Sequence, residues 1–212
     1  LAEVGQPQYP NRWSDISTMT ISYGYGVSVS PLQLANAVAS LVNGGRRMSV
    51  SLLKHQSKEP PVGVRVISEK TSKQMRDLMH LVVTNGTGRN AAVPGYQIGG
   101  KTGTAEKQVN GRYDEKSLVS SFVGAFPIDR PRYVLLALLD EPNGTKKTFN
   151  NATGGWVAAP IVSQMIWRMA SLFGILPSGS LRPKMQLKQK NPKLAYLDDD
   201  RLGYMEQYLA PN

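Results

Sequence analysis

The sequence predicts an α+β fold in which an antiparallel sheet is flanked by helices. Three segments carry helical patterns with clear ends, and three others have the composition of strands. The last two strand segments, 117–126 and 132–141, are joined only by residues 127–131, so they must pair antiparallel because a parallel crossover needs a longer connection. A chain of 212 residues with 41% hydrophobic residues is long enough and apolar enough to bury a core.

The first elements are predicted from their turn and capping residues. Residues 14–30 alternate loosely between polar and apolar side chains and contain glycines, which favours short extended pieces joined by a turn. A helix then begins at Pro31, because Ser30 is a natural N-cap and proline fits the first helical position. Asn43 and the two glycines after it end this helix. Its apolar stripe consists of Leu34, Val38, Leu41 and Val42.

The middle of the chain predicts sheet-edge pieces and a second helix. Residues 46–67 alternate weakly around two prolines, as strands and loops near a sheet edge do. A helix follows over residues 68–84, capped either by Ser68 or by the pair Thr71 and Gln74. It stops at residues 85–88, Asn-Gly-Thr-Gly, where glycine allows close backbone approach. The residues expected to face inward are Met75, Leu78, Met79 and Val82, with His80 at the helix surface or the core edge.

The rest of the chain predicts three strands, a third helix and a tail. The strand candidates are residues 96–105 and the two segments that pair antiparallel, and the helix spans residues 155–173 and stops at Gly174. The residues expected on its buried face are Val157, Ile161, Met165, Ile166, Met169 and Phe173. Residues 177–212 are polar and contain prolines, so we expect a folded part over residues 1–176 and a polar C-terminal tail.

The composition excludes several kinds of site. The chain has no cysteine, which rules out disulfides, thiolate zinc sites and a cysteine nucleophile. Its two histidines, His55 and His80, are interpreted as structural, so we expect no metal and no cofactor. The net charge of +10 would suit an anionic partner, but the loose lysine cluster at 184–193 is followed by the acidic run 198–200. We therefore expect a solvated basic surface and no nucleic-acid partner, and keep a basic polyanion-binding module as an alternative.

The ends of the chain bear on its cellular context. No apolar run is long enough to span a bilayer, and no signal peptide opens the chain. The first residues are typical of the middle of a protein, so we expect a fragment of a longer one.

The stretch GYQIGGKTGTAE, residues 95–106, fits two incompatible chemistries. Its first eight letters match the phosphate-loop pattern G-x-x-x-x-G-K-S/T, and residues 134–140 imitate the strand ending in aspartate that holds magnesium in phosphate-loop ATPases. A phosphate loop needs a helix that begins at its lysine and threonine. Here Gly103 follows at once, apolar residues are almost absent and a tight-turn signal comes at Asn110. The phosphate-loop ATPase is therefore the weaker interpretation.

The same letters contain K-T-G at residues 101–103, which requires an extended edge strand beside a cleft. Lys101 places an ammonium where it can hold an anionic group, and Thr102 and Thr104 project on one face of a strand. Because Gly103 lacks a side chain, a substrate backbone can lie against the strand as an added strand. The N–H of Thr104 would then point at a developing oxyanion. The alternative is an exposed edge strand that its lysine keeps soluble.

Four stretches carry a family likeness: YGYGVSVSPLQLANAVASLVNGG (23–45), NGTGRNAAVPGYQIGGKTGTAEK (85–107), SSFVGAFP (120–127) and PRYVLLALLDEP (131–142). In order and spacing they resemble the C-terminal half of the transpeptidase domain of class B penicillin-binding proteins of the cell-division type. The resemblance implies the penicillin-binding protein/β-lactamase-like transpeptidase fold, with residues 1–176 as the C-terminal portion of that domain. It also implies an enzyme whose serine attacks the penultimate D-Ala carbonyl of a peptidoglycan stem peptide, after which an amine of a neighbouring stem resolves the acyl-enzyme.

The resemblance also implies roles for the K-T-G residues and a cellular setting. Lys101 would support proton transfer and the substrate carboxylate, while Thr102, Gly103 and Thr104 would bind substrate and the Thr104 amide would form half of the oxyanion hole. β-Lactams imitate the D-Ala-D-Ala end and acylate the same serine. The implied partners are stem peptides, β-lactam antibiotics and divisome proteins. The implied location is the bacterial inner membrane, with the catalytic domain on the periplasmic face and an N-terminal anchor that this chain does not contain.

Two motifs of the family are missing from their expected places. S-x-x-K supplies the nucleophile and general base, but its only occurrence, at Ser51 and Lys54, lies too close to K-T-G and in a strand-like segment, so we interpret it as structural. No S-x-N occurs in the chain. We therefore expect this fragment to be inactive alone. A serine β-lactamase-like hydrolase, which shares K-T-G, stays an alternative.

Overall fold

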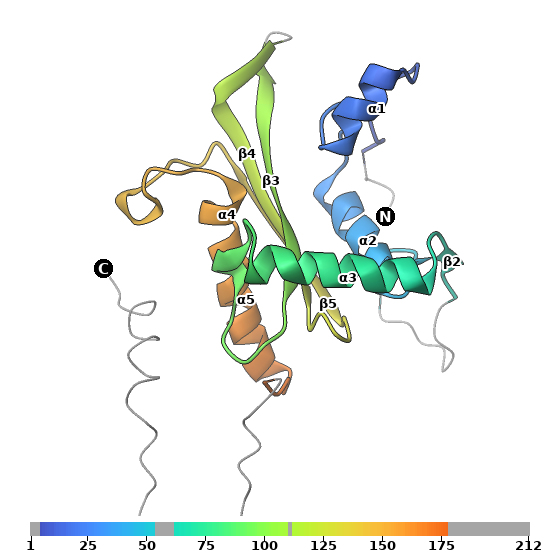
Figure 1. Cartoon of the computed structure of the whole chain (residues 1–212), viewed down its shortest axis with the longest axis vertical. Coiled ribbons are helices and arrows are strands. Elements are labelled where there is room, and N and C mark those ends of the chain that lie inside the picture. The colour runs from blue at the N-terminus through green and yellow to red at the C-terminus, as the bar shows by residue number, and fades with distance from the viewer. Residues whose placement is uncertain (1–4, 54–61, 110–111, 178–212) are drawn as a thin grey trace, which may run out of the picture. The chain divides into compact units, whose positions relative to one another are not determined.

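A three-stranded antiparallel sheet carries the core of the fold (Figure 1). The computed structural model describes residues 5–53, 62–109 and 112–177. The strands are β3 (Gly99–Val109), β4 (Arg112–Phe126) and β5 (Tyr133–Asp140), in the spatial order β3-β4-β5. β4 pairs antiparallel with both neighbours, which confirms the prediction made from the short connection between the last two strands.

Helices and a small second ribbon surround this sheet. The helices are α1 (Asp15–Ser22), α2 (Pro31–Val42), α3 (Glu69–Thr84), α4 (Gly154–Val157) and α5 (Ala159–Leu172), and the 3₁₀ turns are η1 (Arg89–Ala91) and η2 (Lys146–Thr148). The strands β1 (Arg46–Arg47) and β2 (Val64–Arg65) pair antiparallel with each other. The weak strand signals predicted over residues 46–67 therefore correspond to a two-residue ribbon.

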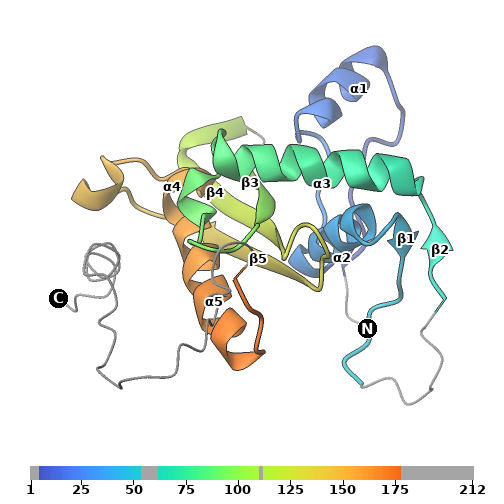
Figure 2. The same ribbon diagram turned by 60° about the horizontal axis from the view of Figure 1, so that its bottom comes forward.

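Helices pack on both faces of the sheet (Figure 2). Alternate residues of β4 point to opposite faces. Phe122 and Phe126 are buried together with α5, whereas Val123 and Ala125 are buried together with α2 and α3. Burial of this apolar surface on two sides holds the sheet, and with it the K-T-G strand, in a fixed place.

The predicted helix ends are confirmed by their hydrogen bonds. The Ser30 hydroxyl accepts a hydrogen bond from Gln33 N–H at 3.3 Å, and the Gln33 side chain accepts one from Ser30 N–H at 2.8 Å. Ser68 caps α3 by accepting from Thr71 N–H at 3.0 Å, which decides between the two predicted caps. Gly44 follows α2 with a φ of +90°, a conformation that glycine adopts without steric cost.

The N-terminal segment differs from its prediction, because residues 15–22 form helix α1 and not extended pieces. Ser14 accepts a hydrogen bond from Ser17 N–H at 3.1 Å and caps the helix, and Asp15 follows in the first turn. Apolar residues at Ile16, Met19 and Tyr23 fit a helical period as well as a loose alternation. Over so short a segment the two periods cannot be told apart, and capping decides.

The buried faces of two helices also differ from their predictions. On α3, Met79 is buried as expected, but Leu78 is 56% exposed. On α5, Ile161 and Met165 are 38% and 39% exposed, and Phe173, just after it, is 51% exposed. Ile166 of α5 is buried as expected, and the other buried residues are Ser72 and Val83 on α3 and Ala159, Val162 and Ala170 on α5. Ser72 on α3 and the two alanines on α5 are small, which lets each helix approach its neighbours closely at those positions.

The predicted single helix over residues 155–173 is interrupted. The structure has the short helix α4, then a break at Ala158, then α5. Pro160 lies at the start of α5, where its missing N–H costs nothing, whereas inside one continuous helix it would remove a hydrogen bond. The break separates α5 from α4, whose first residue, Gly154, contacts the sheet.

Candidate active site

The K-T-G residues lie on an edge strand, as predicted. β3 pairs with β4 on one side, and no described strand pairs with its other side. Lys101 and Thr102 lie inside this 11-residue strand, with Val123 and Phe122 as their partners on β4, and no helix begins at them. The phosphate-loop interpretation is therefore wrong, because phosphate binding needs a loop that runs into a helix N-terminus. An open edge exposes backbone donors and acceptors with which an extended peptide can pair.

The register of β3 assigns the K-T-G side chains to faces of the sheet. Thr102 and Thr104 pair with Phe122 and Ser120 of β4, on the face where α5 packs. Lys101 points to the opposite face because successive residues of a strand alternate. Both faces border the open edge, so a peptide laid along β3 would meet the ammonium of Lys101 and the hydroxyls of both threonines.

Helix α4 begins directly on the K-T-G strand. The N–H of Gly154 donates a hydrogen bond to Thr104 Oγ1 at 3.1 Å. A Cβ on Gly154 would overlap the carbonyl oxygens of Ser121 and Gly103, so only glycine allows this approach. A Cβ on Gly155 would overlap the carbonyl of Thr87 and touch Thr102 Cγ2 at 3.5 Å. The start of α4 thus holds Thr104 by a hydrogen bond and lies close to Thr102.

Thr87 is a site residue that the sequence reasoning missed. Its Oγ1 lies 2.9 Å from Thr102 Oγ1, so one hydroxyl donates to the other. Residues 85–88 indicate a helix stop with close backbone approach and belong to one of the four family-like stretches, but neither signal assigns a role to Thr87. A Cβ on Gly88 would lie 2.9 Å from the Phe122 ring, which shows how tightly this loop packs behind the strand. Asn90 links the same loop to α4, because its Nδ2 donates a hydrogen bond to the Gly155 carbonyl at 2.9 Å.

Lys101 is exposed, and its Nζ donates to the carbonyl of Thr102 at 2.8 Å. Within the described part of the chain it forms no ion pair. An unpaired ammonium beside an open strand edge can bind a carboxylate without first breaking a salt bridge.

A second lysine on the same strand is fully paired. Lys107 Nζ lies 2.8 Å from Asp140 Oδ1 and 2.8 Å from Glu141 Oε1. These hydrogen bonds raise the pKa of Lys107 from 10.5 to about 12, and the bond to Asp140 makes the largest contribution. The folded-state pKa lies above the unfolded one, so the pair favours folding below about pH 10.5, and that contribution is lost as the pH rises through 12.

We expect an NMR titration of the Lys107 ammonium to have its midpoint near pH 12. Replacing both acids, Asp140→Asn with Glu141→Gln, should return that midpoint to about 10.5, because the charge-assisted hydrogen bonds are gone. A wild-type midpoint already at the lower value would contradict the pairing.

Ser51, the only serine in an S-x-x-K pattern, makes local hydrogen bonds. Its Oγ donates to the Leu53 carbonyl and accepts from the Leu53 N–H, both at 3.1 Å. Lys54 and His55 lie outside the described residues, as does the tail after Pro177. His80 occupies the core edge as predicted, half-buried with Nδ1 2.8 Å from the Ile98 carbonyl.

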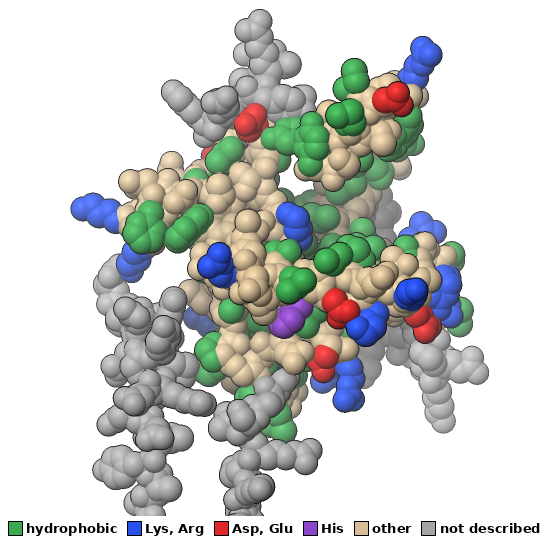
Figure 3. Space-filling view, viewed as in Figure 1, with side chains coloured by type: hydrophobic (Ala, Val, Ile, Leu, Met, Phe, Trp, Pro, Cys, Tyr) green, Lys and Arg blue, Asp and Glu red, His purple; other side chains and the backbone are tan. Residues whose placement is uncertain are grey.

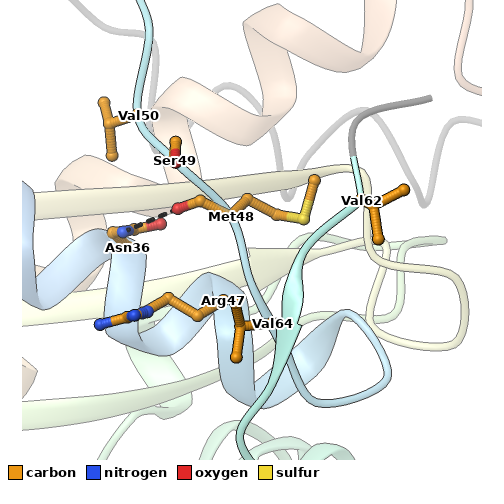
Figure 4. Close-up of a pocket in the computed structure, with 7 residues that line it drawn as sticks. All are labelled: Asn36, Arg47, Met48, Ser49, Val50, Val62 and Val64. Atoms are coloured by element: carbon orange, nitrogen blue, oxygen red, sulfur yellow. Dashed lines mark hydrogen bonds between the residues drawn. The ribbon is translucent and has the colours of Figure 1, made fainter. Parts of the chain in front are cut away.

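A pocket of about 290 Å³ lies elsewhere, between α2 and the β1–β2 ribbon (Figure 4). Its lining residues are Asn36, Arg47, Met48, Ser49, Val50, Val62 and Val64. None of the K-T-G residues lines this pocket.

Charged side chains of both signs lie on the described surface. Figure 3 shows Lys and Arg side chains at separate places on one face, with acidic side chains among those near α3. Two of these neighbours form ion pairs, Arg65 with Glu69 and Lys73 with Asp77. Over the described ranges there is no group of three or more His, Cys, Asp or Glu that could hold a metal. In the same residues no helix has the length and apolarity to cross a membrane.

Comparisons with known proteins identify the family to which this chain is similar. The family model described as the penicillin binding protein transpeptidase domain matches residues 3–166. A probable peptidoglycan D,D-transpeptidase FtsI from Caulobacter vibrioides is 41% identical over 184 residues, which are 82% of this chain and 31% of that protein. Stage V sporulation protein D from Bacillus subtilis is 40% identical over 176 residues, 78% of this chain and 26% of that protein. The chain thus spans less than a third of the length of these relatives.

Solved structures show the same fold. The transpeptidase domain of penicillin-binding protein 3 from Burkholderia pseudomallei superposes with a TM-score of 0.72 at 40% identity, covering 79% of this chain and 50% of that one. Penicillin binding protein 3 from Mycobacterium tuberculosis, complexed with ampicillin, gives 0.70 at 27% identity, covering 84% of this chain and 43% of that one. These matches confirm the predicted transpeptidase fold and disfavour the polyanion-binding alternative. With the family model covering residues 3–166, the chain belongs to the penicillin-binding protein transpeptidase domain family.

Proposed function

We propose that this chain carries the K-T-G half of the active site of a peptidoglycan D,D-transpeptidase that cross-links stem peptides during septal wall synthesis. The observation that carries the proposal is the open K-T-G edge strand, with the hydroxyls of Thr102 and Thr104 fixed from behind by Thr87 and Gly154. Two related proteins are named as probable peptidoglycan D,D-transpeptidases, and this supports the same activity for the chain. In this proposal the nucleophile is the serine of a family S-x-x-K motif other than Ser51–Lys54, because Ser51 makes local hydrogen bonds with Leu53.

In the proposed reaction the serine oxygen attacks the penultimate D-Ala carbonyl and its proton passes to a base. The Thr104 N–H stabilises the oxyanion, and collapse of the tetrahedral intermediate expels the terminal D-Ala, whose nitrogen takes up a proton. Lys101 and the hydroxyls of Thr102 and Thr104 hold the substrate carboxylate. An amine of a second stem then attacks the ester, releases the serine and forms the cross-link. A β-lactam enters the same step, but its opened ring keeps the leaving nitrogen attached.

The cellular setting follows from this activity. Its substrates lie outside the inner membrane, so the catalytic domain faces the periplasm and an N-terminal segment anchors it. Divisome proteins are its proposed partners, and β-lactam antibiotics its inhibitors.

A fluorescent penicillin tests this function. The complete protein should form a covalent band on a denaturing gel, and Lys101→Ala should slow acylation by about a hundredfold because one charged donor to the carboxylate is lost. Lys70→Ala, on the exposed first turn of α3, is the control and should react normally. The 212-residue chain alone should stay unlabelled.

Two results would overturn parts of this proposal. A covalent band on the isolated chain would place the nucleophile within it and contradict the structural interpretation of Ser51. Steady hydrolysis of the antibiotic by the complete protein would favour the β-lactamase-like hydrolase, because a transpeptidase leaves the acyl-enzyme for an amine acceptor.

A further inference from the structure

The K-T-G strand continues into a two-stranded ribbon that β5 does not support. β5 pairs with β4 only from Val119 to Phe126, whereas β3 and β4 stay paired as far as Val109 and Arg112. The ribbon appears in Figure 1 as the long arm formed by β3 and β4. Two-stranded ribbons twist more strongly than strands inside a wider sheet. The ribbon therefore tends to twist the strand that carries the site.

The pairing also changes register where the ribbon begins. Glu106 pairs with Leu118, but the next residue, Lys107, pairs with Asp114. The extra residues on β4 form a bulge, and bulges increase the local twist. This irregularity lies two residues from Thr104, so a change of twist there would move the threonine hydroxyl and its N–H.

Lys107 crosses this junction and ties β3 to β5, a strand that β3 does not touch in the sheet. Its ammonium is 2.8 Å from carboxylate oxygens of both Asp140 and Glu141, at the end of β5. Glu141 is fixed in turn, since its N–H donates to the Leu118 carbonyl at 2.8 Å and its φ is +51°. Leu118 is the pairing partner of Glu106, so the acids are anchored to the last regular step of the sheet.

We propose that Lys107, Asp140 and Glu141 form a clamp that shields the K-T-G stretch from the twist of the ribbon, which makes Lys107 a positioning residue for Thr104. The proposal rests on the transpeptidase function above. The acidic side chains are 63% and 57% exposed, and exposed ion pairs add little to global stability. The clamp therefore acts on site geometry, where a displacement of about 1 Å can cost up to a hundredfold in rate.

The test measures acylation of the complete protein by penicillin. Lys107→Met should lower the second-order acylation rate by about tenfold, because Thr104 loses its alignment, while thermal stability changes little. Lys107→Arg keeps both charge-assisted contacts and should restore most of the rate. Asp140→Asn with Glu141→Gln should reproduce the loss, and adding Lys107→Met to it should cost nothing more.

Lys73→Met is the matched control, because it breaks another exposed lysine–carboxylate pair of 2.8 Å, to Asp77 on α3. It should leave acylation unchanged. An unchanged rate in Lys107→Met, or additive losses in the combined variant, would overturn the clamp. If Lys107→Met does not fold, the acylation rate of the variant Asp140→Asn with Glu141→Gln tests the clamp in its place.

Hydrogen exchange separates this proposal from the proposed function. The amides of residues 103–106 should exchange faster in Lys107→Met than in the wild type, because the strand is less restrained. If the wild-type protein forms no penicillin adduct, the transpeptidase proposal fails. Hydrogen exchange of these amides still tests the clamp in that case. Equal exchange in the two proteins would overturn the clamp even if acylation occurs.

Discussion

Replacing Gly154 by alanine is expected to lower the free energy of unfolding by about 3 kcal/mol, as overpacking at a rigid contact does. The added Cβ would overlap two backbone oxygens, those of Gly103 in the K-T-G strand and Ser121 in β4. Backbone cannot rotate away as a flexible side chain can, so either α4 or the strand must move. In the complete protein we also expect acylation to fall by about a hundredfold, because Thr104 loses the Gly154 N–H and shifts.

Denaturant unfolding of the chain and penicillin acylation of the complete protein measure these two effects. Gly5→Ala is the control for stability, because nothing lies within 4 Å of the added methyl and the change should stay within about 0.5 kcal/mol. Gly103→Ala should cost less than Gly154→Ala, since its Cβ would meet the Ser121 side-chain Oγ, which can rotate. An unfolding curve unchanged by Gly154→Ala would mean that α4 does not rest on the sheet as described.

Phe122→Ala is expected to cost about 3–5 kcal/mol of folding stability. Phe122 is fully buried in the centre of the core between the sheet and α5. Three glycines close around its ring: a Cβ on Gly88 or Gly124 would come within 2.9 or 3.2 Å of it, and one on Gly100 would overlap it. On the sides where these glycines lie, they offer no side chain that could move into the cavity.

Phe149→Ala provides the matched control for this cavity. Phe149 is 76% exposed and makes an edge contact with the Trp156 ring at 5.6 Å between centroids. Losing it should cost no more than about 1 kcal/mol. Similar unfolding midpoints for the two alanine variants would show that Phe122 is not the core residue described. Thr102, the cross-strand partner of Phe122, should lose its position in Phe122→Ala, so acylation should fall as well.

Local signals explain why the sequence predicted so many elements. The ends of α2 and α3 depend on side chains three residues apart, Ser30 with Gln33 and Ser68 with Thr71, and those pairs are visible in the letters. The connection after Phe126 is short, and that alone makes β4 and β5 antiparallel. In α1 the apolar residues fit a helical period and a strand alternation equally well. The sequence could not distinguish them, and the prediction of extended pieces was wrong.

The buried faces of the helices could not be predicted from local patterns in the sequence. Leu78 was expected inside because it is large and apolar, yet the sheet contact is made by Met79 and Val83 of α3. On α5 the buried residues include the small alanines and also Ile166, so neither size nor hydrophobicity alone predicts the buried face. Residue size at a contact has meaning only once the partner surface is known.

By itself the sequence determined the antiparallel sheet, the helices with strong caps and the extended K-T-G strand, because each depends on residues close together in the chain. Tertiary structure alone decided what surrounds that strand. Thr87 reaches Thr102 across 15 residues, Gly154 reaches Thr104 across 50, and Lys107 reaches Glu141 across 34. These contacts depend on strand register and on how closely helix α4 approaches the sheet, and both are set by packing between segments that no local pattern relates.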